Sequence, residues 1–171
     1  MLFAPTLEEH WEYYSRLFQS GDRVLDYGAG DFSFVRKLRT KGIEAEGCNR
    51  QIKAPDSFDF NTLSFSESVG YLTPETFRSL IRPTVNKVIL KDFYALPGTS
   101  LVVEETGYDM GFLRDTVIPT LICSWFRVEV GEFKPHRDRW MRLLQKYDIP
   151  YIAYPHLCTV IVRAVRDPIA I

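Results

Sequence analysis

An apolar run that enters a glycine turn and leaves it as an amphipathic helix is the feature that most constrains this chain. Arg23 to Tyr27 is a short strand-like run, and Gly28-Ala29-Gly30 follows it directly. After the turn, one helical face is apolar and carries Phe34, Val35 and Leu38. Ile43 to Cys48 then has the pattern of a second strand. Strand, glycine turn, helix and strand form a βαβ unit, which predicts an α/β fold with a parallel sheet.

Length and composition limit what this fold can be part of. The 171 residues suffice for one hydrophobic core, so we expect a single domain over residues 1–171. A net charge of -1 argues against wholesale attraction to nucleic acid or to an anionic membrane. No apolar run approaches the roughly 20 residues of a membrane span, and we expect a soluble, cytoplasmic protein. Three scattered cysteines, Cys48, Cys123 and Cys158, favour buried thiols over a disulfide framework or a metal site.

The first half of the chain offers further elements of the same kind. Leu7, Trp11, Tyr14 and Phe18 recur at helical spacing. Phe58 to Phe65 is a third apolar run, and Thr73-Pro74 has the signature of a helix start, with Pro83 as the stop. We expect the fourth strand at Val85 to Leu90; Ser100 to Val103 competes for that place but would need a longer connection.

The second half predicts how the sheet closes. Asp109 could cap a helix that runs through Ile118, and Trp125 to Val130 alternates like a strand. Pro135 opens a predicted helix whose apolar face carries Trp140, Leu143, Leu144 and Tyr147. Tyr151 to Tyr154 and Leu157 to Arg163 are separated by a short turn, so these two strands must be antiparallel. The expected architecture is a mostly parallel sheet with a C-terminal antiparallel hairpin.

The residues around the glycine turn indicate the ligand. Asp26 stands two residues before Gly28, Asp31 follows Gly30, and Ser33 occupies the place of the third glycine of a dinucleotide fingerprint. Two carboxylates repel a pyrophosphate but attract a cationic amino-acid ligand. This turn therefore favours S-adenosylmethionine (SAM) over a nicotinamide dinucleotide, and a nucleotide-binding oxidoreductase is the weaker option.

At these residues the chain resembles the class I SAM-dependent methyltransferases. Their first motif, acid-x-Gly-x-Gly, is matched by Asp26, Gly28 and Gly30, and the resemblance spans about residues 22–93 and 135–164. It implies a Rossmann-like sheet with helices on both faces. It also implies that Phe58 to Phe60, followed by Leu63 to Tyr71, corresponds to the family's fourth strand, whose tip lies beside the sulfonium. The second strand is implied to end at the ribose. The SAM-binding residues implied in this way are Asp26, Tyr27, Gly28, Ala29, Gly30, Asn49, Ser64 and Phe65.

Two departures from the family pattern concern the nucleoside half of SAM. Family members usually end the second strand with an acid that binds the ribose hydroxyls, and Asn49 stands there, at a cost of about 1–2 kcal/mol in binding. Residues 50–57 are too few for the helix and strand that the family places next. The chain is therefore expected to be a trimmed member in which adenine is held differently or weakly.

The acceptor is less constrained by the sequence. Asn61 to Ser66 departs from the Asn-Pro-Pro-Tyr motif of enzymes that methylate exocyclic amines, and no Pro-Cys pair is present for attack on cytosine. Methyl transfer needs alignment and sometimes a base. The catalytic residue is left open among the candidate bases Glu67, Tyr71, Asp92, Tyr94, Glu104, Glu105 and His136.

Two further segments have both a functional and a structural interpretation. A basic cluster, Lys134 to Arg142, either binds a phosphate or carboxylate or is the solvated face of a helix. The ring-rich residues 106–133 could form an apolar lid over the acceptor or a homodimer surface. The leading hypothesis is a methyltransferase acting on a small-molecule acceptor. The alternative is a catalytically inactive member of the fold kept as a binding or assembly module.

Overall fold

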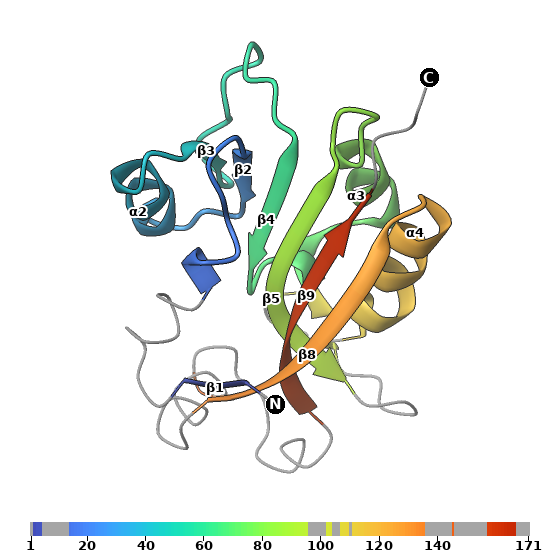
Figure 1. The fold of residues 1–171 in the computed structure, drawn as a ribbon. Helices are drawn as coiled ribbons and strands as arrows, with labels where there is room; N and C mark the ends of the chain where they lie inside the picture. Colours follow the sequence, from blue (N-terminus) through green and yellow to red (C-terminus); the bar gives the residue numbers. More distant parts are fainter. Residues whose placement is uncertain are drawn as a thin grey trace.

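The structure is a computed structural model that describes residues 2–4, 14–95, 102–103, 107–109, 111–135, 145 and 157–166. These residues form one large sheet and a separate two-stranded ribbon (Figure 1). The large sheet has the order β1-β8-β9-β5-β4-β2-β3. Its strands are β1 (Leu2–Ala4), β2 (Arg23–Tyr27), β3 (Glu44–Cys48), β4 (Thr62–Ser66), β5 (Lys87–Ala95), β8 (Arg127–Pro135) and β9 (Leu157–Val165).

The predicted βαβ unit is present. Strand β2 pairs in parallel with β3 on one side and with β4 on the other, and β4 pairs in parallel with β5. Helix α2 (Ser33–Thr40) makes the crossover and buries the three predicted apolar residues. The third strand begins at Thr62, later than the apolar run suggested, because Phe58 and Phe60 pack into the core from the preceding loop.

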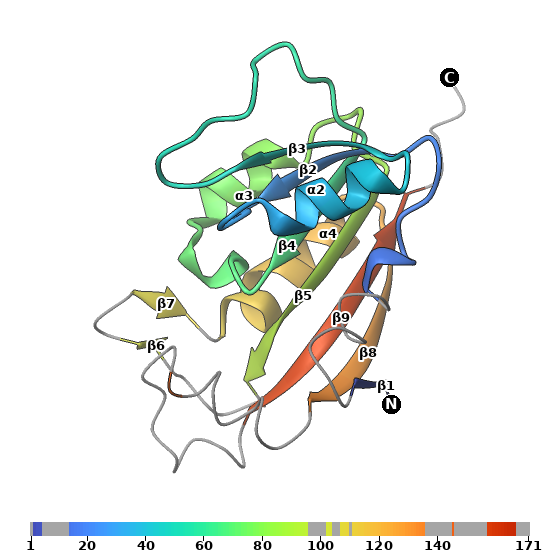
Figure 2. The same cartoon turned by 90° about the vertical axis from the view of Figure 1, so that its left-hand side faces the viewer.

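Helices cover both faces of the sheet, as expected. Adjacent residues of a strand face opposite sides, and Val24 packs with α2 whereas Leu25 packs with the cluster of Phe77 and Leu121. Phe77 belongs to α3 (Pro74–Leu80) and Leu121 to α4 (Ile118–Cys123). Figure 2 shows α2 in front of the sheet and α3 and α4 behind it.

Helix α3 begins as the sequence predicted. The hydroxyl of Thr73 accepts a hydrogen bond from the backbone N–H of Thr76, and Pro74 occupies the first turn. The 3-10 turn η1 (Val69–Tyr71) connects β4 to this helix. At the other end, α3 stops at Leu80, shortly before Pro83. The connection to β5 is short, as expected, and the strand predicted at Val85 to Leu90 is observed at Lys87–Ala95.

The competing strand lies elsewhere. Val102–Val103 (β6) pairs with Tyr108–Asp109 (β7) in a two-stranded ribbon outside the large sheet. Asp109 therefore lies in a strand and does not cap a helix. Its carboxylate instead accepts the backbone N–H of Gly111, and the helical segment starts at Leu113 (η2, Leu113–Val117) and runs into α4.

The last strand, β9, closes the sheet in antiparallel orientation, as predicted, but its partners in the sheet are not residues 151–154. Strand β9 runs antiparallel to β5 and to β8. The strand predicted at Trp125 to Val130 is observed at Arg127–Pro135, so Pro135 ends a strand where it was expected to open a helix. A proline is tolerated at a strand end because its missing N–H removes no central ladder bond. The predicted helical face from Trp140 and the strand at residues 151–154 lie outside the described residues.

Tyr14 and Phe18 of the predicted first helix are buried against α2, whereas Leu7 and Trp11 are outside the described residues. Within the described part of the chain, no helix combines the length and apolar character of a membrane span.

Candidate functional site

A cleft of about 1090 Å³ lies where the parallel strands β2, β3 and β4 end. The chain leaves β2 towards β3 on one side and later returns to β4 on the other, so this point is where the strand order reverses. Ligands of open α/β sheets bind at such switch points, outside the carboxyl ends of the strands. Six of the eight predicted site residues line the cleft: Asp26, Tyr27, Gly28, Ala29, Gly30 and Asn49.

The turn after β2 needs its glycines. Gly28 has a φ of 82° and Gly30 a φ of 57°, which side chains disfavour. A Cβ at Gly28 would also stand 2.5 Å from the Cβ of Ser68, so the turn packs directly against the Ser68 side chain, which follows β4. The N–H groups of Gly28 and Ala29 both donate to the carbonyl of Cys48, at 2.9 and 2.8 Å. The turn is thus tied to β3 and held in place.

Asp26 lies beneath this turn and is 2% exposed. Its carboxylate accepts a 2.8 Å hydrogen bond from the hydroxyl of Ser64. The Ser64 oxygen lies 3.1 Å from the hydroxyl of the fully buried Tyr14. Burial raises the pKa of Asp26 to about 6, although the Ser64 hydrogen bond and the charge of Lys91 act in the opposite direction. Near neutral pH the cleft therefore contains a desolvated carboxylate, which stabilises a cationic ligand group strongly.

A second carboxylate, Glu67, lines the cleft from the end of β4. Its backbone has a φ of 55°, an uncommon conformation for a residue other than glycine. One carboxylate oxygen lies 3.0 Å from the ammonium of Lys91, whose side chain is only 2% exposed. This buried ion pair sets where the Glu67 carboxylate stands.

The candidate bases separate into distinct environments. Glu67 and Tyr71 line the cleft, and Tyr71 is 39% exposed. Asp92 is buried and accepts hydrogen bonds from the Val69 N–H and from the hydroxyl of Tyr108, so it acts as a structural group. Tyr94 lies on β5, with no described side chain. The remaining candidates, Glu104, Glu105 and His136, lie outside the described residues.

Asn49 lines the cleft but has a structural task there. Its side-chain carbonyl accepts the N–H groups of Gln51 and Ile52, at 2.9 and 2.7 Å, and its amide donates to the carbonyl of Gly30 at 3.0 Å. These bonds close the turn after β3 and join it to the glycine turn. Residues 49–61, all of them described, contain neither helix nor strand, as the trimmed pattern predicted.

Ser64 and Phe65 do not line the cleft. Both are fully buried: Ser64 is bonded to Asp26, and Phe65 packs between the rings of Tyr27 and Phe77. The cleft is reached two residues later, because β4 continues to Ser66. The residues of this strand end that line it are Ser66, Glu67 and Ser68.

Sequence reasoning also missed three basic residues. Arg50, Lys53 and Arg82 line the cleft, from the loop after β3 and from the segment after α3. The two residues of the loop follow Asn49 closely, so their position beside the site was within reach of the sequence. Arg82 lies far along the chain, and only the tertiary structure brings it there. The basic cluster from Lys134 to Arg142 has no described side chains.

Comparison with known proteins identifies the architecture. No family model and no curated protein sequence matches the chain. Among solved structures, phosphoethanolamine N-methyltransferase 2 of Haemonchus contortus is similar, with a TM-score of 0.67 and 15% identity over 94% of this chain and 52% of that one. Geranyl diphosphate C-methyltransferase of Streptomyces coelicolor A3(2) has a TM-score of 0.67 and 13% identity over 94% and 80%.

Both structures contain S-adenosylhomocysteine. An O-methyltransferase from a multienzyme of Brevibacillus brevis, also solved with S-adenosylhomocysteine, has a TM-score of 0.62 and 13% identity. The chain spans about half the length of the Haemonchus enzyme. At such identities the likeness concerns the fold. Together with the strand order and the acid-x-Gly-x-Gly turn, it identifies the chain as having the Rossmann-like fold of the class I SAM-dependent methyltransferases.

Proposed function

We propose that this protein binds SAM in the cleft and transfers its methyl group to a small-molecule acceptor. The observation that carries the proposal is the buried Asp26 carboxylate beneath the Gly28–Gly30 turn, at the point where the strand order reverses. The similar structures support it, since they were solved with SAM or its product and with small acceptors such as geranyl diphosphate.

The residues that line the cleft suit the amino-acid half of SAM. Asp26 would face its cationic groups, and the open side of Gly30, with no heavy atom within 4 Å of a Cβ position, leaves room for a ligand against the backbone. The nucleoside half would lie near Asn49, whose carbonyl oxygen already accepts two backbone N–H groups. Bound SAM would supply an electrophilic methyl group.

Glu67 is the group we assign to proton removal from the acceptor. It lines the cleft, is positioned by Lys91, and is one of the two candidate bases found there. As an ionised carboxylate it can accept the proton that an acceptor O–H or N–H loses. Lys91 is not among the residues that line the cleft, and its side chain is only 2% exposed. We therefore assign it a positioning role.

A non-catalytic module remains the second candidate, because of Asn49. In this family an acid binds the ribose, but here the corresponding side chain is committed to closing a turn. A protein of this fold that has given up SAM would keep the sheet and lose the need for the carboxylates in the cleft. The retained pair of Asp26 and Glu67 favours the methyltransferase.

Titration calorimetry of the full chain with SAM and S-adenosylhomocysteine tests the proposal. We expect micromolar binding that weakens at least tenfold in Asp26→Asn and is lost in Gly28→Val, where a side chain would meet Ser68. Asp59→Asn is the matched control, since Asp59 is exposed at the opposite end of β4 and is absent from the cleft. No heat with millimolar SAM would rule out the methyltransferase and leave the binding module.

A further inference from the structure

Asp26, Ser64 and Ile89 stand side by side on three neighbouring strands, and Tyr14 packs over them from the segment that precedes β2. Asp26 is in register with Ser64 between β2 and β4, and Ser64 with Ile89 between β4 and β5. Residues paired in register share one face of a sheet. On this face Tyr14 packs with Ile89 and with Phe34 of α2, and its side chain is fully buried. Tyr14 therefore lies next to the site without lining the cleft.

The hydroxyl of Tyr14 has three oxygens within reach. It lies 3.1 Å from the Ser64 oxygen, and it can donate at 3.1 Å to the carbonyls of Phe65 and Ile89. A hydroxyl has one hydrogen, so the three oxygens compete for it. Ser64 gives its own hydrogen to Asp26 at 2.8 Å, and its oxygen can accept the hydrogen of Tyr14. Tyr14, Ser64 and Asp26 thus form a chain of hydrogen bonds that ends on the carboxylate.

The charge of Asp26 decides the direction in which the Tyr14 hydroxyl donates. Beside an ionised carboxylate, O–H dipoles are most stable with their hydrogens towards the negative charge. A hydroxyl that accepts a hydrogen bond is also a stronger donor, so Tyr14 strengthens the bond from Ser64 to Asp26. Beside a neutral carboxyl, the Tyr14 hydrogen can turn to a backbone carbonyl and keep a partner. The Tyr14 hydroxyl therefore stabilises the ionised form of Asp26 more than the neutral form.

The other titratable groups around Asp26 come from the ends of β3, β4 and β5. Burial has the largest influence on the pKa of Asp26 and raises it to about 6. The Ser64 hydrogen bond opposes burial more strongly than the charge of Lys91 does, and the Lys91 ammonium is itself paired with Glu67 at 3.0 Å. The Cys48 thiol is neutral near pH 7, because burial raises its pKa and the charge of Asp26 adds to the rise. The Ser64 hydroxyl is thus the main support of the Asp26 charge.

Tyr14 is a neutral donor beside this carboxylate. Burial, followed by the charge of Asp26, raises the pKa of the Tyr14 hydroxyl well above its ordinary value, and the charge of Asp92 acts in the same direction. The rings of Phe18 and Phe34 contact the Tyr14 ring, at centroid distances of 5.4 and 5.0 Å. Packing therefore fixes where the hydroxyl stands, and the hydroxyl keeps its proton when Asp26 loses one.

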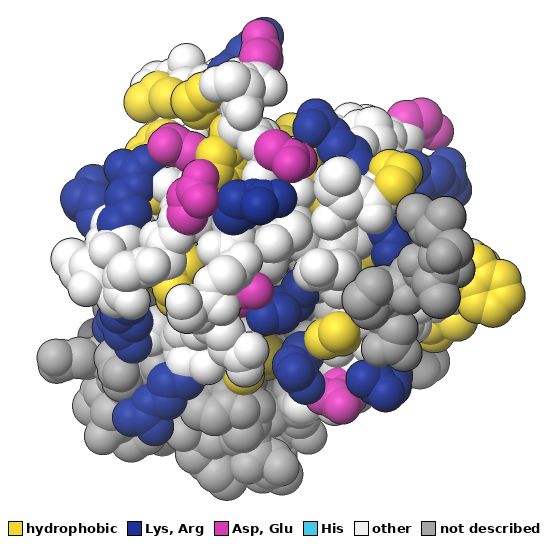
Figure 3. Space-filling model, turned by 45° about the horizontal axis from the view of Figure 1, so that its top comes forward, with side chains coloured by type: hydrophobic (Ala, Val, Ile, Leu, Met, Phe, Trp, Pro, Cys, Tyr) yellow, Lys and Arg dark blue, Asp and Glu magenta, His cyan; other side chains and the backbone are white. Residues whose placement is uncertain are grey.

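Charge elsewhere on the molecule gives a cationic ligand little guidance. The net charge is -1, and acidic and basic side chains are interspersed on the face shown in Figure 3. A surface of mixed sign produces a weak field at a distance. Attraction for the cationic half of SAM must then come from carboxylates in the cleft, so the charge state of Asp26 matters for binding.

We propose that Tyr14 is a positioning residue of the cofactor site, which acts through Ser64 to hold the Asp26 carboxylate in the orientation and charge state that bind the cationic half of SAM. The inference rests on the proposed function and adds to it a fully buried residue outside the cleft. Because Tyr14 acts through Ser64, its effect on Asp26 should vanish when the Ser64 hydroxyl is removed.

The pKa of Asp26 in the cofactor-free chain tests this chain of hydrogen bonds by itself. It is measured from the carboxyl carbon-13 resonance during a pH titration, with Asp26→Asn to assign the signal. Tyr14→Phe keeps the buried ring and should raise the pKa of Asp26 by about 0.5–1. Ser64→Ala removes the direct bond and should raise it further. Added to Ser64→Ala, Tyr14→Phe should change it by less than about 0.2.

Tyr108→Phe is the matched control for this titration. Tyr108 is also buried, but its hydroxyl donates to the carboxylate of Asp92. This variant should leave the pKa of Asp26 within about 0.2 of the wild-type value. An equal rise in Tyr108→Phe and Tyr14→Phe would overturn the inference, as would a full effect of Tyr14→Phe in the Ser64→Ala background or no effect of Tyr14→Phe in the wild type.

SAM affinity, measured by calorimetry between pH 5.5 and 8, shows whether the cofactor uses this charge. At pH 6 we expect Tyr14→Phe to bind SAM about two- to fivefold more weakly than the wild type, because less of its Asp26 is ionised. At pH 8 the two affinities should agree. An equal loss at both pH values would overturn the inference, since it would indicate a packing defect. A wild-type chain that binds no SAM would instead refute the proposed function, and the titration of Asp26 would still decide whether Tyr14 controls this carboxylate.

Discussion

Asp26 lines the cleft with a carboxylate, but its buried position disfavours the ionised form of that carboxylate. Burial raises its pKa from an ordinary 3.8 to about 6. The folded chain therefore holds the proton more tightly than the unfolded chain, and the stability present below pH 3.8 is lost as the pH rises through about 6. A shift of this size corresponds to roughly 3 kcal/mol at neutral pH. Such a residue is expected where ligand binding outweighs stability.

Asp26→Asn should therefore separate stability from binding. We expect the free energy of unfolding at pH 8 to rise by up to about 3 kcal/mol, because a neutral amide can still accept the Ser64 hydroxyl without the desolvated charge. The gain should shrink as the pH falls towards 5, where the wild-type carboxyl is protonated. Urea unfolding at several pH values measures it. A loss of stability at pH 8 would mean that Lys91 stabilises the carboxylate more than burial penalises it.

The two glycines of the turn should respond differently to the same substitution. Alanine at Gly30 meets no atom within 4 Å and costs only the left-handed backbone, about 1 kcal/mol. Alanine at Gly28 has that cost and in addition a Cβ 2.5 Å from Ser68, which should bring the loss to about 3 kcal/mol or more.

Chemical unfolding of Gly28→Ala and Gly30→Ala compares the two directly. The variant with both Gly28→Ala and Ser68→Gly should recover part of the loss, since it removes the colliding atom. Equal losses in the two alanine variants would show that the close approach of the turn to β4 is not a stability determinant.

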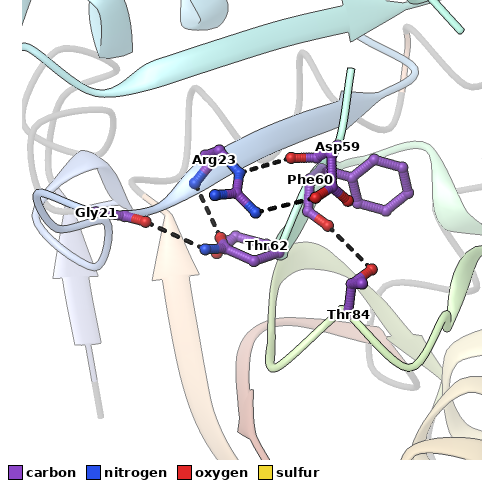
Figure 4. A network of polar contacts seen from close by, with 7 residues as sticks. Gly21, Arg23, Asp59, Phe60, Thr62 and Thr84 are labelled. Atoms are coloured by element: carbon purple, nitrogen blue, oxygen red, sulfur yellow. Dashed lines mark hydrogen bonds and ion pairs between the residues drawn. The ribbon is translucent and has the colours of Figure 1, made fainter. Parts of the chain in front are cut away.

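At the scale of elements, Asn61 anchors the segment that takes the place of a helix and strand. Its side chain accepts the N–H of Arg23 at 2.9 Å and donates to the carbonyl of Gly21 at 3.1 Å. Its backbone carbonyl accepts the N–H of Asn86 at 2.9 Å, so one residue joins the starts of β2, β4 and β5. Figure 4 shows this network around Arg23, with Asp59 and Thr84 at its margin.

Asn61→Ala should destabilise the fold by about 2 kcal/mol, because it leaves the half-buried Arg23 N–H without its acceptor. Asp59→Ala in the same network should cost less than about 1 kcal/mol, since the Arg23–Asp59 pair is largely exposed. Urea unfolding at neutral pH compares the two variants. Similar losses would indicate that the ion pair, rather than the asparagine, holds this end of the sheet together.

At the scale of the whole molecule, β3 is the edge strand on the trimmed side of the sheet that the described residues form (Figure 2). An open edge invites pairing with another chain. Arg39 of α2 reaches over this edge: its side chain donates to the carbonyl of Ala45 at 2.8 Å and pairs with Glu46 at 2.8 Å. A long charged side chain that occupies an edge carbonyl is a common protection against such pairing.

Arg39→Ala should therefore promote self-association more than it affects stability. We expect the free energy of unfolding to change by less than about 1 kcal/mol, because the ion pair is partly exposed. Sedimentation velocity over a concentration series should show larger species for this variant. Arg36→Ala, on the same helix, removes a bond to the carbonyl of Asp31 and should stay like the wild type. Identical behaviour of the two variants would contradict a protective role for Arg39.

Local patterns were enough for most of the fold. The apolar face of α2, the Thr73 cap and the glycine turn are each encoded within a few neighbouring residues. The sequence therefore predicted the βαβ unit, and six of the eight residues expected to bind SAM line the cleft. Asp109 and Pro135 were assigned wrongly because each fits a helix start locally. In the fold, β7 pairing with β6 and the length of β8 outweigh that preference.

By itself, the sequence determined the fold class and the acidic glycine turn, because strand and helix periodicities and turn chemistry act over short stretches of chain. Only the tertiary structure decided that Ser64 bonds to Asp26, that Glu67 pairs with Lys91, and that Arg82 lines the cleft. These neighbours are far apart along the chain, and sheet order alone sets their distance. The charge pattern of the cleft is a property of that packing.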